Sequence, residues 1–198
     1  MLKKVLLGTV ILCTLLCTFN NFTQAADIPP RQTATTVTSK SPHWKKTPIN
    51  VYIPQNEFGS VSMQHAFQRW QKVTSGKANF KFVDKEDQAD IKVLFTDKVT
   101  GSDSPIANYN ITIKGLEIQK AEIQIATKSP NIKKYSNDYI FTTMLHEVGH
   151  ALGLSENSRK PSSIMYMPVN EEQDILKTDI RKLYSISEWS WSDRRIND

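Results

Sequence analysis

Apolar and polar residues alternate in short stretches through the first half of the chain. Residues 49–53 carry isoleucine or valine at every second position and stop at Pro54, which predicts a β-strand. The same alternation predicts four more strands, at residues 80–82, 91–95, 106–113 and 121–126.

Apolar residues recur at helical spacing in three other stretches. The first runs from Val61 to Val73 and is closed by Ser75-Gly76, with glycine in its usual C-terminal position. The other two predicted helices cover residues 139–152 and 171–184. The order is strand, helix, four strands and two helices. It predicts one mixed α/β domain of the α+β class, with a five-stranded sheet on one side of about three helices.

Residues 1–25 have the pattern of a signal peptide. Lys3 and Lys4 give a positive start, an apolar stretch follows, and Thr23-Gln24-Ala25 offers small residues for cleavage after Ala25. We therefore expect a secreted or periplasmic protein with no stable membrane association after cleavage. An uncleaved membrane anchor is the alternative, although the apolar part is shorter than the roughly 20 residues of a spanning helix.

Composition divides the rest of the chain and excludes some partners. Residues 26–43 are rich in Thr, Ser, Pro and Gln, as in a flexible linker or short pro-segment; residues 44–187 form the expected domain, and 188–198 a C-terminal tail. Both cysteines lie in the leader, so the exported chain would have no disulfide.

The net charge of +5 is spread through stretches of mixed sign, which gives no basic face for nucleic acid. We expect a monomer.

His146 and His150 stand four residues apart in a predicted helix, in the pattern His-Glu-Xaa-Xaa-His. Four residues advance a helix by about 400°, so both imidazoles project from one face and can reach one zinc ion at about 2.0–2.1 Å. Glu147 is placed to take a proton from a water on that zinc, as a catalytic base would. The alternative is that these are ordinary helix residues, with Glu147 on a solvated face.

The motif continues through Gly153, and Ser163-Ile164-Met165-Tyr166 follows. In this combination the chain resembles the metzincin metalloproteases, in particular a minimal, bacterial-type form of the matrixin (matrix metalloproteinase-like) catalytic domain. Other stretches resemble matrixin landmarks, namely Trp44 and residues 49–51, 66–70, 89–91 and 178–184.

The resemblance implies a zincin fold, with a twisted mixed sheet over the active-site helix and a methionine-containing turn at Met165 beneath the zinc. It also implies that an edge strand within residues 106–113 pairs with an extended protein or peptide substrate. Residues 165–168 would form the wall of the first primed-side pocket.

The third zinc ligand departs from the family pattern, because no histidine stands at its position. Glu156 occupies that position by spacing, and a carboxylate ligates zinc well. Counting back from Met165 would select Asn157 instead, which is a poor ligand. The two remaining histidines, His43 and His65, are expected to be solvated surface residues. We expect one catalytic zinc; calcium-binding loops are not evident.

Two functions from different classes fit these residues. The first is a secreted zinc metalloendopeptidase with His146, His150 and Glu156 as ligands and Glu147 as general base. The second is a catalytically weak or inactive matrixin-fold module that binds peptides, because the usual third histidine is replaced. The retained Glu147 favours the enzyme, since an inactive descendant has no need of its base.

Overall fold

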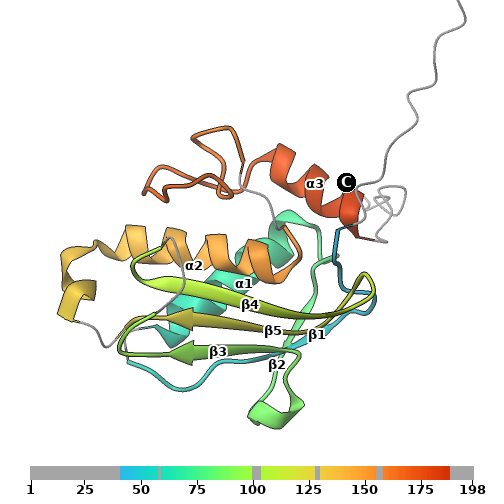
Figure 1. Cartoon of the computed structure of the whole chain (residues 1–198), viewed down its shortest axis with the longest axis horizontal. Coiled ribbons are helices and arrows are strands. Elements are labelled where there is room, and N and C mark those ends of the chain that lie inside the picture. Colours follow the sequence, from blue (N-terminus) through green and yellow to red (C-terminus); the bar gives the residue numbers. More distant parts are fainter. Residues whose placement is uncertain (1–40, 58, 100–103, 128–129, 155–157, 188–198) are drawn as a thin grey trace, which may run out of the picture. The chain divides into compact units, whose positions relative to one another are not determined.

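Five strands form one mixed sheet in the order β2-β1-β3-β5-β4 (Figure 1). Their bounds are β1 Ile49–Tyr52, β2 Phe80–Phe82, β3 Ile91–Phe95, β4 Ala107–Lys114 and β5 Glu117–Ile125. Strands β2, β1, β3 and β5 are mutually parallel, and β4 runs antiparallel to β5 at one edge. All five strands predicted from alternation are present, although β5 begins at Glu117, four residues before the predicted 121–126 strand, and ends at Ile125. The strand predicted over 106–113 is an edge strand.

The structure, a computed structural model, describes residues 41–57, 59–99, 104–127, 130–154 and 158–187. These lie in a compact unit, Val37–Asp198. The predicted leader, most of the predicted linker and the predicted C-terminal tail lie outside the described residues.

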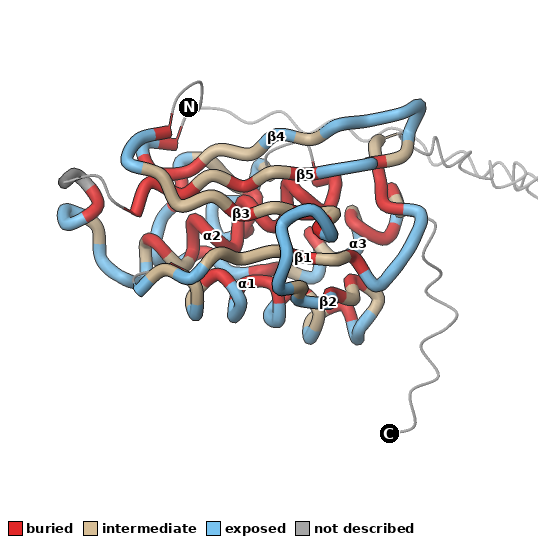
Figure 2. Tube along the Cα trace, turned by 90° about the horizontal axis from the view of Figure 1, so that it is seen from below, coloured by how far each residue is buried: buried red, intermediate tan, exposed pale blue. Residues whose placement is uncertain are grey.

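Among the described residues, three α-helices accompany the sheet: α1 Ser60–Val73, α2 Asn137–Ala151 and α3 Lys177–Ile186, with short 3-10 helices η1 Glu86–Gln88 and η2 Pro130–Lys134. Figures 1 and 2 show α1 and α2 on the same face of the sheet. None of the helices in the described part of the chain is long and apolar enough to span a bilayer.

The core lies between the sheet and these two helices. Strand residues on one side of the alternation are fully buried, as Val51, Ile91 and Val93 show. Figure 2 shows buried positions, in red, on the strands as well as on α1 and α2. Phe67 and Trp70 of α1 are also fully buried. The apolar faces that the sequence predicted for the helix and the strands therefore pack against each other in one core.

The helix ends follow local chemistry. Ser136 precedes α2, and its hydroxyl oxygen accepts a hydrogen bond from the Tyr139 N–H at 3.0 Å, which caps the helix. At the end of α1, Ser75 and Gly76 both adopt positive φ, as the predicted glycine stop requires.

The helix predicted over residues 171–184 is wrong in its first turns, because α3 begins only at Lys177. The Asp174 carbonyl accepts a hydrogen bond from the Ile164 N–H at 2.8 Å, which holds this segment in a bridge with the preceding loop. The Asp179 carboxylate accepts from the Leu176 N–H at 2.9 Å and so caps the shorter helix.

His43 is buried, which corrects the prediction that it lies on the solvated surface. Its backbone N–H donates to the Leu116 carbonyl at 2.9 Å, and its own carbonyl accepts from the Ile118 N–H at 2.9 Å. Trp44 Nε1 donates to the Ala151 carbonyl at the end of α2 at 2.8 Å. These pairings draw the segment into the interior. His65 is exposed on α1, as predicted.

Candidate metal centre

Helix α2 brings His146 and His150 together. Their Nε2 atoms lie 3.0 Å apart, and the ring planes are inclined by 81°. Both side chains are buried, with exposed fractions of 3% and 6%. As predicted from the helical period, the four-residue spacing places both imidazoles on one face of α2, with their Nε2 atoms directed at one point.

Each imidazole is held through its other nitrogen by a backbone carbonyl. Nδ1 of His146 lies 2.6 Å from the Ile164 oxygen, and Nδ1 of His150 lies 2.5 Å from the Leu154 oxygen. A carbonyl can only accept, so these contacts assign the proton of each ring to Nδ1. Each Nε2 is then left with a lone pair, which is the arrangement of a metal-ligating histidine.

Two facing lone pairs 3.0 Å apart cannot hydrogen-bond to each other, whereas one cation between them satisfies both. Nitrogens bound to a tetrahedral zinc at about 2.0–2.1 Å are separated by about 3.3 Å. The observed separation is close to that value. The pair His146 and His150 therefore fits a zinc ion.

The protonation states favour metal binding. Burial lowers the pKa of His146. Burial, together with the charge of His146, lowers the pKa of His150 to about 3. Both rings are therefore neutral near neutral pH, and a neutral imidazole is the form that ligates a metal.

Glu147 follows the first histidine and is buried, with 3% of its surface exposed. Its Oε2 has no hydrogen-bond partner among the residues that the structure describes. Burial raises the pKa of the Glu147 carboxyl to about 8. An unpartnered buried carboxyl group of this kind is typical of a functional site.

Met165 lies against the C-terminal part of α2. A Cβ built on Gly149 would overlap the Met165 sulfur and stand 3.0 Å from Trp70 Cζ2. Glycine between the two histidines therefore allows the methionine to approach the helix backbone. The sequence motif alone gave no reason for glycine at position 149, and the reason is this contact.

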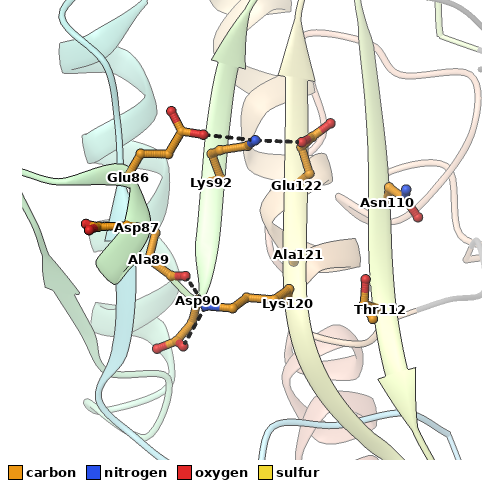
Figure 3. Close-up of a pocket in the computed structure, with 10 residues that line it drawn as sticks. All are labelled: Glu86, Asp87, Ala89, Asp90, Lys92, Asn110, Thr112, Lys120, Ala121 and Glu122. Carbon is orange, nitrogen blue, oxygen red and sulfur yellow. Dashed lines mark hydrogen bonds and ion pairs between the residues drawn. The ribbon is translucent and has the colours of Figure 1, made fainter.

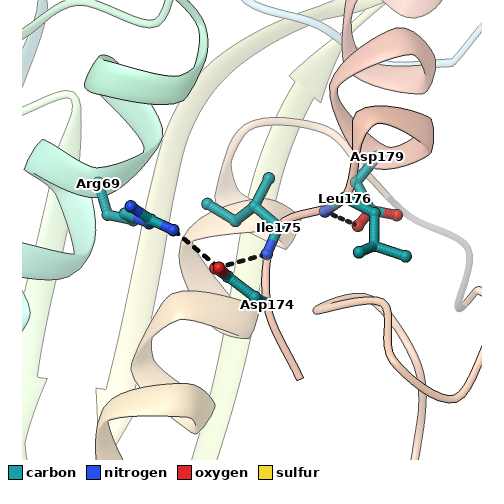
Figure 4. A network of polar contacts seen from close by, with 5 residues as sticks. All are labelled: Arg69, Asp174, Ile175, Leu176 and Asp179. Atoms are coloured by element: carbon teal, nitrogen blue, oxygen red, sulfur yellow. Dashed lines mark hydrogen bonds and ion pairs between the residues drawn. The ribbon is translucent and has the colours of Figure 1, made fainter. Parts of the chain in front are cut away.

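A buried hydrogen-bond network holds the loop that carries Met165. The Ser163 hydroxyl donates to the Asp179 carboxylate at 2.6 Å and accepts from the Met165 N–H at 3.1 Å. Figure 4 shows the same carboxylate receiving the Leu176 N–H. Because Ile164 lies between Ser163 and Met165, this network fixes the carbonyl to which His146 is bound.

Gly153 places the carbonyl that holds His150. Its φ of +104° is in the left-handed region, which lets the chain turn so that the next residue, Leu154, points its oxygen back at His150. A Cβ at Gly153 would also overlap the Pro42 carbonyl oxygen. The turn predicted after the second histidine is therefore present, and Pro42, two residues before Trp44, packs against it.

The third ligand predicted from sequence, Glu156, lies outside the described residues, as does its alternative Asn157. Within the described part of the chain, no three His, Cys, Asp or Glu side chains are grouped so that they could hold a metal ion. The structure thus brings together His146, Glu147, His150 and Met165.

Tyr109 is a member of the site that sequence reasoning missed. It lies on β4, and its ring stacks on that of His150 with centroids 4.2 Å apart and planes inclined by 10°. Burial and the charge of Glu147 raise the pKa of the Tyr109 phenol. Alternation along residues 106–113 could have indicated which face of the strand Tyr109 occupies, but not its partner on a distant helix.

A separate cavity of about 550 Å³ lies on the outer face of the sheet (Figure 3). Eight of the ten residues that line it are polar or charged, and Lys92 bridges Glu86 at 3.1 Å and Glu122 at 3.2 Å across it. Hydrogen bonds to those two carboxylates raise the pKa of Lys92. None of the predicted site residues lines this cavity.

The chain was compared with known protein families and with curated proteins. A family model described as matrixin matches residues 43–186. No curated protein matches the chain. The matched range contains every residue of the centre described above.

Proposed function

The chain belongs to the matrixin family, and from that premise we propose that it is a zinc-dependent metalloendopeptidase that hydrolyses peptide bonds in proteins. Matrixin domains are of the metalloprotease type and typically bind zinc, and a protease of this family acts on protein substrates. The observation that carries the proposal is the convergence of two buried Nε2 lone pairs at 3.0 Å.

His146 and His150 would hold the zinc through Nε2, and Glu156 would complete the ligand set with a carboxylate oxygen. When bound, zinc supplies Lewis-acid activation of a water molecule and of the scissile carbonyl. The carbonyls of Ile164 and Leu154 keep both rings in the tautomer that this role requires.

Glu147 is the proposed general base. Its Oε2 takes a proton from the attacking water and delivers it to the nitrogen of the departing amine. The lack of a hydrogen-bond partner for this oxygen among the described residues supports the assignment, since the atom is available to a water or a substrate.

Strand β4 is the proposed substrate-binding edge. It is the outermost strand of the sheet on the side of α2, and it carries Tyr109 beside His150. The free edge of a strand can pair with the backbone of any extended peptide, which suits an enzyme that cuts within protein chains. Residues 165–168 follow on the other side of the histidines as the proposed wall of the first primed-side pocket.

The proposal is tested by incubating the zinc-loaded protein with a library of internally quenched peptides, with and without a chelator. Chelator-sensitive cleavage at internal bonds is expected. His146→Ala should abolish cleavage, whereas His65→Ala, which alters an exposed histidine on α1, should leave it unchanged. Peptide binding without cleavage by folded, zinc-loaded protein would replace the enzyme with the peptide-binding module.

We also propose that the chain is exported and that its leader is removed. The proposal is supported by the positive start, apolar stretch and small cleavage-site residues of positions 1–25. N-terminal sequencing of the exported protein should give Ala26 as the first residue. A product that still begins at Met1 would instead support the membrane anchor.

A further inference from the structure

The side chains of β4 point alternately to the two faces of the sheet. Asn110 and Thr112 line the cavity on the outer face, where Figure 3 shows them. Tyr109 and Ile111 therefore point to the opposite face, which α2 covers. Opposite Tyr109, the neighbouring strand places Ile123, which is fully buried. The Tyr109 ring therefore lies on the face of the sheet that α2 covers, where it meets His150.

The His150 ring is constrained from three directions. The Leu154 carbonyl holds Nδ1 at 2.5 Å, the His146 ring stands nearly perpendicular to it, and the Tyr109 ring lies parallel to its face at 4.2 Å. One hydrogen bond fixes a point on an imidazole but leaves the ring free to tilt about that bond. A parallel ring against its face restricts the tilt.

We propose that Tyr109 is a positioning residue of the zinc site, which holds the plane of His150 by ring stacking so that Nε2 stays aimed at the metal. The inference rests on the proposed function, because it concerns a ligand of the proposed zinc. It assigns the effect to the ring and not to the hydroxyl. The two histidines then differ in what contacts their rings. His150 is stacked by Tyr109, whereas the His146 ring is contacted by the His150 ring.

The placement of Tyr109 also connects two parts of the proposed mechanism. The residue belongs to β4, the strand proposed to pair with the substrate backbone, while its ring contacts a proposed metal ligand. A shift of this strand would therefore move the ring that orients His150. The substrate edge and the metal centre share one residue.

The test compares zinc affinities of variants that separate ring, hydroxyl and bulk. Tyr109→Phe keeps the ring, and Tyr109→Leu keeps apolar volume on β4 without a ring. Tyr135 supplies a matched control, since it is partly buried and stacks on Tyr139 with centroids 4.6 Å apart, away from the histidines. Tyr135→Leu thus removes a similar stack with no effect expected on the metal.

Zinc dissociation constants are measured on the full exported chain by competition with a chromophoric chelator, and each variant is also loaded with Co²⁺ for its absorption spectrum. Tyr109→Leu is expected to weaken zinc binding about three- to tenfold and to alter the Co²⁺ spectrum. Tyr109→Phe and Tyr135→Leu should stay within about twofold of wild type with unchanged spectra.

Three results would overturn the inference. Wild-type affinity in Tyr109→Leu would mean that the ring does not position His150, while the proposed function would stand. Equal losses in Tyr109→Phe and Tyr109→Leu would assign the effect to the hydroxyl. A wild-type protein that binds no zinc would refute both the inference and the proposed function.

Discussion

Replacing Gly149 with alanine sets two effects of opposite sign against each other. Gly149 lies inside α2, so alanine would gain about 0.8–1.0 kcal/mol of helix propensity. The new Cβ, however, would overlap the Met165 sulfur and stand 3.0 Å from Trp70 Cζ2. Trp70 is fully buried, and its Nε1 donates to the Leu145 carbonyl at 2.9 Å, so it cannot easily move.

Overpacking of this kind costs about 1–3 kcal/mol, which exceeds the gain in helix propensity. We therefore expect Gly149→Ala to lower the free energy of unfolding by about 1 kcal/mol. In a domain of this size the loss corresponds to a fall in Tm of about 2–4 °C. Urea and thermal denaturation of the metal-free protein measure both quantities without any contribution from bound zinc.

The cause can be isolated by a double-mutant cycle with Met165→Ala. That variant alone should lose about 2–5 kcal/mol, because Met165 is buried. Once the sulfur is absent, Gly149→Ala should be less destabilising by about 1 kcal/mol or more. Effects that add within about 0.3–0.5 kcal/mol, or a Gly149→Ala protein more stable than wild type, would refute the packing explanation.

The remaining predictions concern the segments around the two histidines and the ion that they would hold. Asp179→Asn should lower the free energy of unfolding by about 1.5–3 kcal/mol, because the buried Asp179 carboxylate accepts two hydrogen bonds, one of them from Ser163. A loss below about 0.5 kcal/mol in urea denaturation would contradict this. Gly153→Ala should be more destabilising than Gly115→Ala by about 1 kcal/mol or more, since both glycines have positive φ but only a Cβ at 153 overlaps the Pro42 carbonyl; equal falls in Tm would exclude that contact as the cause. Zinc at about 1,000 times its Kd should stabilise the protein by about 4 kcal/mol, seen as a rise in Tm that a chelator reverses; an unchanged Tm would count against zinc binding by the folded state.

Strand and helix periods predicted most of the sheet and two of the three helices, because those elements bury one regular face. The segment before α3 shows where periodicity fails. Residues 171–184 carry a helical apolar pattern, yet the Asp174 carbonyl is bound to the Ile164 N–H and the helix begins three residues later. A hydrogen bond between two residues ten positions apart leaves no signature in the helical period of the sequence.

His43 shows the same limit for burial. A polar residue at the end of a stretch without apolar periodicity predicts a surface position, but backbone pairing with Leu116 in the β4–β5 turn and with Ile118 of β5 draws it into the interior. Main-chain pairing of this kind depends on the path of the backbone and not on the side chain.

Within the site, the four-residue spacing was enough to predict that His146 and His150 share one helix face. It could not predict the Ile164 carbonyl or the Tyr109 ring, because these come from segments that only folding brings near. Nor could it predict that the turn at Gly153 aims the Leu154 carbonyl, four residues after His150, back at that ring. The position of Met165 was predicted from the family resemblance, whereas its contact with Gly149 is a matter of packing.

The proposed chemistry is tested most directly by measuring kcat/KM for peptide cleavage in wild type and Glu147→Gln, with the zinc content of both proteins determined alongside. Glutamine keeps the shape of the side chain but cannot accept the water's proton. We expect equal zinc content and a fall in kcat/KM of about 10²–10⁴. Cleavage by zinc-loaded Glu147→Gln at the wild-type rate would contradict the role of Glu147 as general base.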